Sequence, residues 1–172
     1  MKRKFFLLVV VAILAVGCAR GEQIPWEEEN SLRITTTWRE VNSSYIYYIA
    51  ISTDPIDAPS TKPDDWNRFY VVKWENNNFF FKEPNSIFKP FSSSSISGGE
   101  MVITLSLIND LDYPDTIKVM VVSTDKGGNV EDSLDVGAVT FRPKQESSDS
   151  WNDGSGDTDT VADLLSLKIE VR

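Results

Sequence analysis

The chain has 172 residues, with 17 Lys and Arg, 26 Asp and Glu, a single cysteine and no histidine. The lack of histidine excludes catalytic triads and metal sites that use imidazole, the commonest general base and transition-metal ligand near neutral pH. A net charge of −9 argues against a nucleic-acid partner, because contact with phosphates requires a basic surface.

The amino-terminal segment has the layout of an export signal. Three cations at positions 2–4 precede an apolar stretch over residues 5–16, and the small residue Gly17 precedes Cys18. The stretch is shorter than the ~20 apolar residues of a membrane-spanning helix. We therefore predict a signal peptide over residues 1–17 that is removed by cleavage before Cys18.

The residues at this cleavage site, Leu14-Ala15-Val16-Gly17-Cys18, resemble the lipobox of bacterial lipoproteins, although the leucine lies one position earlier than usual. The resemblance implies that a diacylglycerol is attached to the Cys18 thiol and that the new amino terminus is acylated. Several acyl chains bury enough hydrocarbon to hold a protein stably on a lipid bilayer. The prediction is an extracytoplasmic protein anchored to a bacterial membrane, inner or outer, and the alternative is an export signal with an incidental cysteine.

Residues 18–30 follow as a short, acidic segment containing Pro25, which is typical of an extended tether. Removal of residues 1–17 takes away three of the 17 cations and no acid, so the mature charge is expected near −12. The 155 residues that remain of 172 are enough for one domain with its own core, at about 100 to 150 residues per domain. We expect that domain over residues 31–172.

The apolar residues of this domain follow the two-residue period of β-strands. Residues 32–38 alternate and predict a half-buried strand, whereas residues 45–52 are apolar on both faces and predict a central strand. A proline-containing loop is expected over residues 53–66.

A hairpin is predicted from residues 69–74 and 79–81, because the asparagines of the intervening Glu75-Asn76-Asn77-Asn78 tolerate left-handed turn conformations. The remaining segments in chain order are a weak strand near 87–91, a serine and glycine loop over 92–99, strands over 101–107, 117–123 and 136–141, a disordered acidic loop over 143–160 and a terminal strand over 165–171. About eight or nine short strands and no amphipathic helix predict an all-β fold, a single antiparallel β-sandwich of the immunoglobulin or jelly-roll type.

Two carboxylates follow the predicted central strand, Asp54 at its end and Asp57 in the next loop. Carboxylates that converge with backbone carbonyls can hold calcium, which takes about six to eight oxygen ligands. Asp54 and Asp57 are therefore candidate ligands of a structural calcium ion, and no other cofactor is expected. The alternative is that Asp54 accepts hydrogen bonds within its own turn.

Aromatic residues are the candidates for ligand binding. Trp66, Tyr70 and Trp151 offer flat rings on which the apolar face of a sugar can stack, and Arg68 offers hydrogen-bond donors. The alternative for each ring is a place in the core, where large aromatic side chains on strands usually lie. Exposure of Trp66, Tyr70 and Trp151 on one surface would distinguish a sugar site from core packing.

Four segments in order, YYIAISTDP, DDWNRFYVVKW, MVITLSLINDL and IKVMVVSTDKGGNVEDSLD, resemble the DOMON-like and family-nine-like carbohydrate-binding domains. The resemblance covers roughly residues 32–141 and implies an extracytoplasmic β-sandwich whose ligand is a sugar or another small molecule. Haem is not expected, because the chain has no histidine. Domains of one fold bind different ligands, so the resemblance does not by itself fix a function.

These observations predict a membrane-anchored, non-catalytic binding module for a carbohydrate or a small polar ligand, held on the lipid bilayer through acylated Cys18. The alternative is an envelope protein that contacts other proteins or has a structural role, without a small-molecule ligand. An enzyme is not expected. Glycoside hydrolysis needs only two carboxylates, but among 26 acids such pairs arise by chance.

Overall fold

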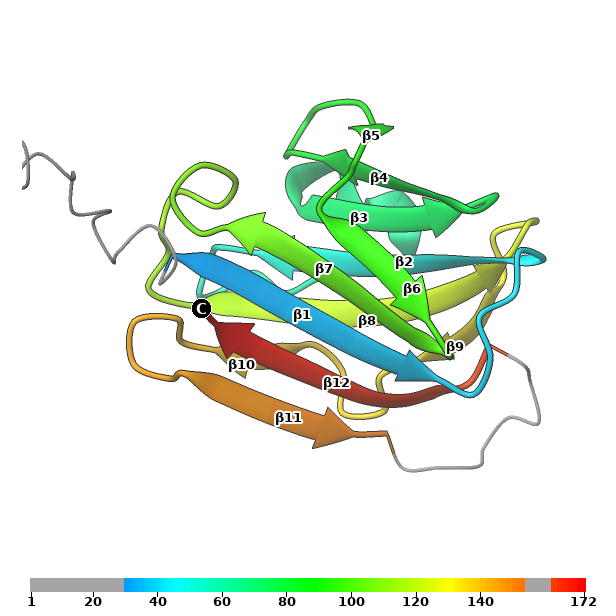
Figure 1. Ribbon diagram of the computed structural model, residues 1–172. Coiled ribbons are helices and arrows are strands. Elements are labelled where there is room, and N and C mark those ends of the chain that lie inside the picture. The colour runs from blue at the N-terminus through cyan, green and yellow to red at the C-terminus, as the bar shows by residue number, and fades with distance from the viewer. Residues whose placement is uncertain (1–29, 154–161) are drawn as a thin grey trace, which may run out of the picture.

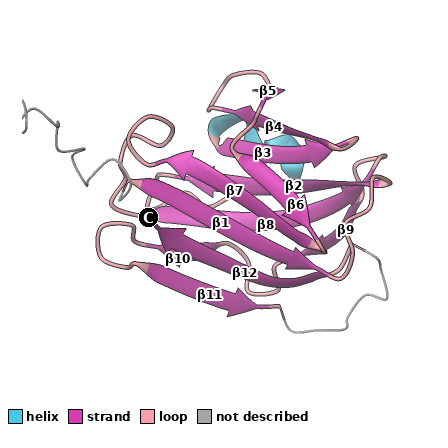
Figure 2. Ribbon diagram, viewed as in Figure 1, coloured by secondary structure: helices cyan, strands magenta, loops and turns pink. Residues whose placement is uncertain are grey.

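The computed structural model describes residues 30–153 and 162–172, and their regular structure is almost entirely β-strand (Figures 1 and 2). The strands form two antiparallel sheets. One has five strands in the order β11-β12-β1-β7-β6, and the other has seven, in the order β10-β8-β2-β3-β4-β5 with β9 also paired to β8. The two sheets enclose one core of apolar side chains, which confirms the predicted all-β sandwich.

The twelve strands are β1 Ser31–Trp38, β2 Tyr45–Ser52, β3 Tyr70–Glu75, β4 Asn78–Lys82, β5 Lys89–Pro90, β6 Ser94–Ser97, β7 Glu100–Ser106, β8 Ile117–Asp125, β9 Val130–Ser133, β10 Val139–Phe141, β11 Ser148–Asn152 and β12 Leu164–Val171. The helical structure of the described residues is one 3₁₀ helix, η2 Pro63–Arg68, shown in cyan in Figure 2. Nowhere in these residues does a helix have the length and apolar character that a bilayer crossing requires.

Alternation in the sequence gives β1 one buried face. Leu32, Ile34, Thr36 and Trp38 are buried, while the residues that alternate with them are partly exposed. β1 lies between β12 and β7, with Ile34 opposite both Ile169 and Ile103, so apolar side chains from three strands meet on one face. The strands predicted as central are also confirmed, because β2 pairs with β8 on one side and with β3 on the other.

β3 and β4 form the predicted hairpin. Asn76 and Asn77 make its two-residue turn, with φ angles of 50° and 63°. Both angles lie in the left-handed region, which asparagine enters more readily than most residues. A turn with two such residues matches the twist of the strands that it joins, so the local sequence specifies this register.

Several short strands do not show the two-residue alternation of apolar residues, so the described residues form twelve strands where eight or nine were expected. β6 lies within the serine and glycine segment expected as a loop, whereas the weak strand expected near residues 87–91 shrinks to β5. β11 lies within the acidic segment over residues 143–160 that was expected to be disordered, and it pairs with β12 from Ser148 opposite Glu170 to Asn152 opposite Ser166. An edge strand of this kind is held by backbone hydrogen bonds to one neighbour and needs no apolar pattern.

Some sequence predictions fall outside the described residues. These are the signal peptide over residues 1–17, the lipidation site Cys18, the tether up to residue 29, and residues 154–161 of the acidic loop.

The segment over residues 89–97 passes from one sheet to the other. β5 pairs with β4, and Phe91 N donates a hydrogen bond to Phe79 O at 2.9 Å. Two residues later Ser93 O accepts a hydrogen bond from Thr104 N at 2.9 Å, and β6 then pairs with β7. This crossover connects the two sheets along one side of the sandwich. β4, which precedes it, belongs to the seven-stranded sheet, and β6, at its end, belongs to the five-stranded sheet.

The sandwich has two distinct ends. At the entry end, where Asn30 precedes β1, Ser31 N donates a hydrogen bond to Arg172 O at 2.8 Å, so both limits of the domain lie together. The entry end also carries the loops over residues 53–69, 107–116 and 142–147, on the left in Figure 1, and the opposite far end carries the turns over residues 39–44, 76–77 and 126–129, on the right.

Candidate functional site

Trp66, the first of the rings predicted to bind sugar, is buried. Its residue exposure is 1%, and its ring packs edge-on against Tyr48 with centroids 5.8 Å apart. The indole Nε1 donates a hydrogen bond to Ser60 O at 2.9 Å within the 53–69 loop, and the contact with Tyr48 packs this loop on β2. The prediction of an exposed ring at Trp66 is therefore wrong, and the alternative of a core position is confirmed.

The other predicted ligand-binding residues do not gather around Trp66. Tyr70 in β3 stacks on Phe81 of β4, with centroids 6.3 Å apart and ring planes 13° apart. Trp151 is half-buried in β11, the last strand of the other sheet, and packs against the core. Arg68 follows Trp66 in η2 and forms an ion pair with Asp57, which lies earlier in the same loop. No common surface joins these residues, so the site predicted from them is not formed.

Asp54 and Asp57, the predicted calcium ligands, have other partners. Asp54 Oδ1 accepts hydrogen bonds from Ile56 N at 2.8 Å and from Asp57 N at 3.4 Å, which is the turn structure of the alternative interpretation. Asp57 binds the Arg68 guanidinium through both oxygens, at 2.8 and 2.9 Å. Residues 30–153 and 162–172 contain no group of three or more side chains that could hold a metal ion. These two carboxylates therefore shape their loop, and the geometry does not support a calcium site there.

An open groove lies at the far end, beside β4 of the seven-stranded sheet and β6 of the five-stranded sheet. It has two parts of about 640 and 740 Å³, each within the range of about 300 to 1,000 Å³ typical of ligand pockets. The parts share Asn77, Phe79 and Ser94, so they form one depression, which we call the β4–β6 groove. The first part is also lined by Val41, Asn42, Ser43, Trp74, Ser95 and Ile96, and the second by Asn78, Phe80, Pro90, Phe91 and Ser92.

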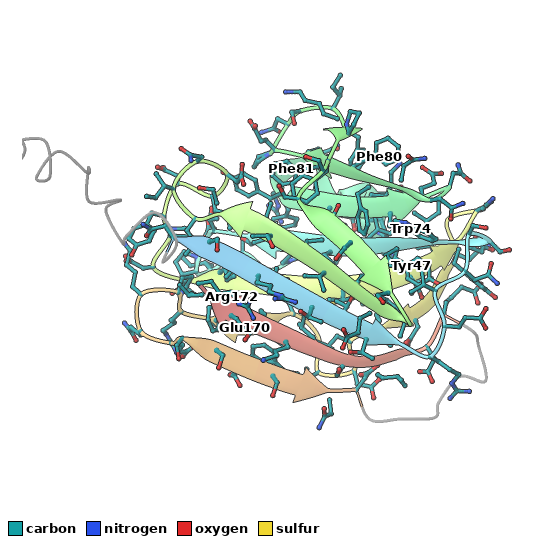
Figure 3. The ribbon with its side chains drawn as sticks, in the orientation of Figure 1. Tyr47, Trp74, Phe80, Phe81, Glu170 and Arg172 are labelled. Carbon is teal, nitrogen blue, oxygen red and sulfur yellow. The ribbon has the colours of Figure 1, made fainter. Side chains whose placement is uncertain are left out.

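Buried aromatic rings support the base of this groove. Trp74 meets Tyr47 edge to face with centroids 5.5 Å apart, and Tyr47 meets Trp38 in the same manner at 4.7 Å; Tyr47 and Trp74 are labelled in Figure 3. Each such pair contributes about 0.5–1.5 kcal/mol beyond the burial of its surface. Trp38 Nε1 also donates a hydrogen bond to Thr36 Oγ1 at 2.9 Å. The chain of rings fixes Trp74, of which 6% is exposed, beneath the groove.

Tyr47 also holds one wall of the groove. Its phenol oxygen accepts a hydrogen bond from Asn42 N at 3.0 Å and donates one to Glu40 O at 3.2 Å. Burial raises the pKa of the Tyr47 phenol above its ordinary value of 10.0, so the donor is retained at neutral pH. The segment containing Val41, Asn42 and Ser43 is therefore fixed beside the groove by a core residue.

The residues that line the groove carry no charge. Charged residues make up 25% of the chain, yet the 14 lining residues, nine in one part and eight in the other with three shared, include no Asp, Glu, Lys or Arg. They supply side-chain amides, hydroxyls and aromatic rings instead. Such groups donate and accept hydrogen bonds without favouring an anion or a cation, so the groove suits a neutral ligand.

The edge of β6 adds backbone groups to this surface. Ser93 O is bonded to Thr104 N, and β6 continues with Ser94 opposite Ile103. Bonded and non-bonded pairs alternate along antiparallel strands, so the N–H and C=O groups of Ser94 and Ile96 point away from β7. Because β6 is the last strand of its sheet and both residues line the groove, these backbone groups are available on its side.

The lysines of the β3–β4 hairpin are engaged elsewhere. Lys73 Nζ lies 2.8 Å from Glu75 Oε2 and 4.6 Å from the centre of the Phe88 ring. Lys82 Nζ lies 5.4 Å from the same ring, and burial lowers the pKa of this amine. Side chains alternate between the faces of a strand, so Lys73 projects from the face opposite that of its neighbour Trp74. Neither lysine lines the groove, although Lys73 Nζ also lies 5.3 Å from the centre of the ring of Phe80, a lining residue.

A second polar cluster lies between β9 and the start of β12. Asp132, Asp153 and Asp163 are 6, 8 and 1% exposed, and Asp132 accepts a hydrogen bond from Leu164 N at 2.6 Å. Burial, reinforced by the Asp153 and Asp163 carboxylates, raises the pKa of Asp132 to about 6. Arg39 Nη2 lies 2.7 Å from Asp163 Oδ2, a charge contact without an aligned hydrogen bond. The cluster attaches β12 to β9 and is separate from the groove.

Comparison of the chain with protein-family models, with curated proteins and with solved structures yields no match. The resemblance to DOMON-like and family-nine-like domains therefore stays a prediction, and the function has to be argued from the groove itself.

Proposed function

We propose that the protein is a lipid-anchored, extracytoplasmic binding module that holds a neutral carbohydrate in the β4–β6 groove. The observation that carries this proposal is the uncharged lining, in which partly exposed Phe79 and Phe91 stand among asparagine and serine side chains. A neutral sugar has apolar C–H faces that pack on rings and hydroxyls that exchange hydrogen bonds with amides and hydroxyls. A sulfated or uronic sugar would bring a charge that nothing in the lining neutralises.

The same lining supports binding without catalysis. Glycoside hydrolysis uses a pair of carboxylates about 5 to 10 Å apart on either side of the scissile bond. The residues of the groove include no carboxylate, thiol, amine or imidazole. A sugar bound there would meet neither the carboxylate nucleophile nor the general acid of glycoside hydrolysis among these residues, and their serine hydroxyls have no base among them to activate attack.

The position of the groove suits an anchored protein. The lipobox resemblance at Leu14 to Cys18 implies attachment through the segment that leads to Asn30, and the groove is lined by turns at the far end. A ligand would therefore bind at the end of the domain that is directed away from the anchor. Acylation of Cys18 can be checked by mass spectrometry of protein purified from the membrane fraction of cells.

Isothermal titration with full-length protein tests the ligand class. The probes are maltohexaose, cellohexaose and laminarihexaose, with hexagalacturonic acid as the charged counterpart. We expect binding of a neutral hexamer and none of the uronic hexamer. Phe79→Ala should weaken the neutral complex at least tenfold, whereas Phe88→Ala, which removes a ring outside the lining, should not. Absence of binding by every neutral probe, or equal losses in the two variants, would contradict the proposal.

One observation favours the alternative of a protein-binding envelope lipoprotein. The outward backbone groups of Ser94 and Ile96 at the edge of β6 could pair with an extended peptide, as sheet edges do when they accept an added strand. A peptide ligand of this kind would be insensitive to competition by neutral oligosaccharides, so competition separates the two functions.

A further inference from the structure

Three exposed apolar side chains of the entry end stand on two of its loops. Ile56, in the loop after β2, is 88% exposed, and Ile108 and Tyr113, in the loop after β7, are 55 and 41% exposed. Single exposed apolar residues are common and need no explanation. What distinguishes these three is that they share one end of the sandwich, the end at which the chain enters.

Hydrogen bonds attach both loops to that end. Leu107 N donates to Asn30 O at 2.7 Å, so the residue before Ile108 is bonded to the residue at which the tether joins the domain. Lys118 Nζ, at the start of β8, donates to Ile56 O at 3.1 Å. Lys144 Nζ lies 4.8 Å from the centre of the Tyr113 ring. Tyr113 thus has a cation close to its side chain, and Ile56 has one bound to its backbone.

Both ends are acidic, but to different degrees. The entry end carries six cations and eight acids, namely Lys62, Arg68, Lys118, Arg142, Lys144 and Arg172 with Asp54, Asp57, Asp64, Asp65, Asp110, Asp112, Asp115 and Glu146. The turns and strand ends of the far end carry two cations and six acids, namely Arg39 and Lys126 with Glu40, Glu75, Glu100, Asp125, Asp153 and Asp163. A membrane that contains anionic lipid therefore repels the far end more strongly than the entry end.

The tether keeps this end near its anchor. Asn30 is 12 residues after Cys18, and a chain of that length spans at most about 43 Å when fully extended. A tethered surface meets the membrane at a high effective concentration, so a weak apolar contact is enough to hold it there. Isoleucine and tyrosine are residue types that enter the boundary between headgroups and acyl chains.

We propose that Ile56, Ile108 and Tyr113 form a docking surface that inserts into the interface of the lipid bilayer and directs the β4–β6 groove away from it. The proposal rests on the lipid anchoring given above as part of the proposed function. Docking adds a second membrane contact to the one that the acyl chains make. It gives a fixed orientation to a protein that would otherwise rotate freely on its tether.

Depth-dependent quenching tests this surface in the full-length, acylated protein. Acylation leaves no free thiol on Cys18, so a cysteine introduced by Ile108→Cys or Ile56→Cys can be labelled specifically with the fluorophore NBD. Lys126→Cys, in an exposed turn of the far end, is the matched control. The proteins are reconstituted into vesicles of phosphatidylcholine and phosphatidylglycerol that contain phosphatidylcholine with a spin label on its acyl chain. We expect more than half of the emission at positions 56 and 108 to be quenched, and less than a tenth at position 126.

The outcomes separate docking from anchoring. Weak quenching at all three positions, in protein whose mass includes the acyl chains, would overturn the docking surface and leave the anchor intact. Quenching at only one of positions 56 and 108 would also overturn it, because a surface requires both loops. A mass without acyl chains would instead overturn the anchor. In the acylated protein, adding Ile56→Ser and Tyr113→Ser to Ile108→Cys should reduce quenching at position 108 at least twofold, and no reduction would contradict a shared surface.

Discussion

Asp132 makes the stability of the domain depend on pH, in the direction opposite to acid denaturation. Burial disfavours its charged form, so its pKa is about 6 in the folded protein against 3.8 for an ordinary aspartate. Between these two values the folded state binds more protons than the unfolded state. The free energy of unfolding therefore falls as the pH rises from about 4 through 6, and it levels off above about 7.

The size of this effect follows from the shift. About two pKa units at 1.36 kcal/mol each give about 3 kcal/mol in total. About 2.4 kcal/mol of this is lost between pH 4 and pH 7, because the unfolded aspartate is already mostly ionised at pH 4. For a domain of this length that corresponds to a decrease in Tm of about 5 to 10 °C. The carboxylates whose pKa is lowered by hydrogen bonds, Asp125 and Glu170, act in the other direction but only below their ordinary values of 3.8 and 4.5. The pH range in which Asp132 affects stability is therefore distinguishable from the lower range in which Asp125 and Glu170 affect it.

Urea unfolding at half-unit steps from pH 4.5 to 8 measures the effect, with Asp132→Asn as the variant and Asp149→Asn, an exposed carboxylate of β11, as the control. Asparagine removes the charge and one of the two acceptor oxygens of Asp132, which bind Leu164 N and Ser133 N. The absolute stability of Asp132→Asn is thus less informative than its slope. Over this range we expect the wild type and the control to lose about 2 kcal/mol and the Asp132 variant to stay flat within about 1 kcal/mol. A wild-type curve that is flat, or that rises with pH, would refute the reasoning.

Three further substitutions test the packing. Trp66→Ala should lower stability by about 3–5 kcal/mol in a denaturant titration, because it removes a buried ring, and the protein that stays folded should keep its affinity for ligand. Gly99→Ala should cost more than Gly98→Ala in thermal melts, since both residues have positive φ but an added Cβ would lie 2.7 Å from a carbonyl oxygen of β1 only at Gly99. Arg39→Ala should destabilise the domain by about 1–3 kcal/mol at neutral pH, since it leaves Asp163 buried without its cation, and Asp163→Asn in the same background should recover part of that loss.

Sequence alternation finds the strands that face the core and misses those at the edges. β1, β7 and β12 each alternate, and β2 and β8 are continuous apolar runs, so the side chains themselves report the burial of these strands. β6 reads Ser-Ser-Ile-Ser and β11 reads Ser-Asp-Ser-Trp-Asn, sequences also found in loops. The strand structure of β11 comes from backbone bonds to β12, which lies beyond a loop and gives no local signal. β6 pairs with β7 across Gly98-Gly99, which have positive φ angles, so the Gly-Gly pair was the local hairpin signal for this strand.

The candidate site was missed for a related reason. Its lining comes from the β1–β2 loop, the β3–β4 hairpin and the crossover into β6, which meet only when the two sheets are packed. Trp66 and Trp151 were attractive because each lies among polar residues in the sequence. A local polar context does not report exposure, as the 1% exposure of Trp66 demonstrates. The asparagines at positions 76–78 and the serines at positions 92–95 were the available signal, and their meaning depends on the strand partners of each segment.

The charge of the far end bears on which sugars the groove can select. The lining is neutral, and the loops around it carry Glu40, Glu75 and Asp125 with Arg39 and Lys126, in a chain whose net charge is −9. An excess of one sign of charge creates a potential that repels ions of the same sign before contact is made. Two effects therefore act against anionic glycans. At short range the lining offers no cation to the glycan's carboxylates, and at long range the negative potential repels them. Salt screens only the long-range repulsion. Raising the ionic strength should thus leave the affinity for a neutral hexamer unchanged and should not give the uronic hexamer an equal affinity, because the lining itself offers its carboxylates no partner.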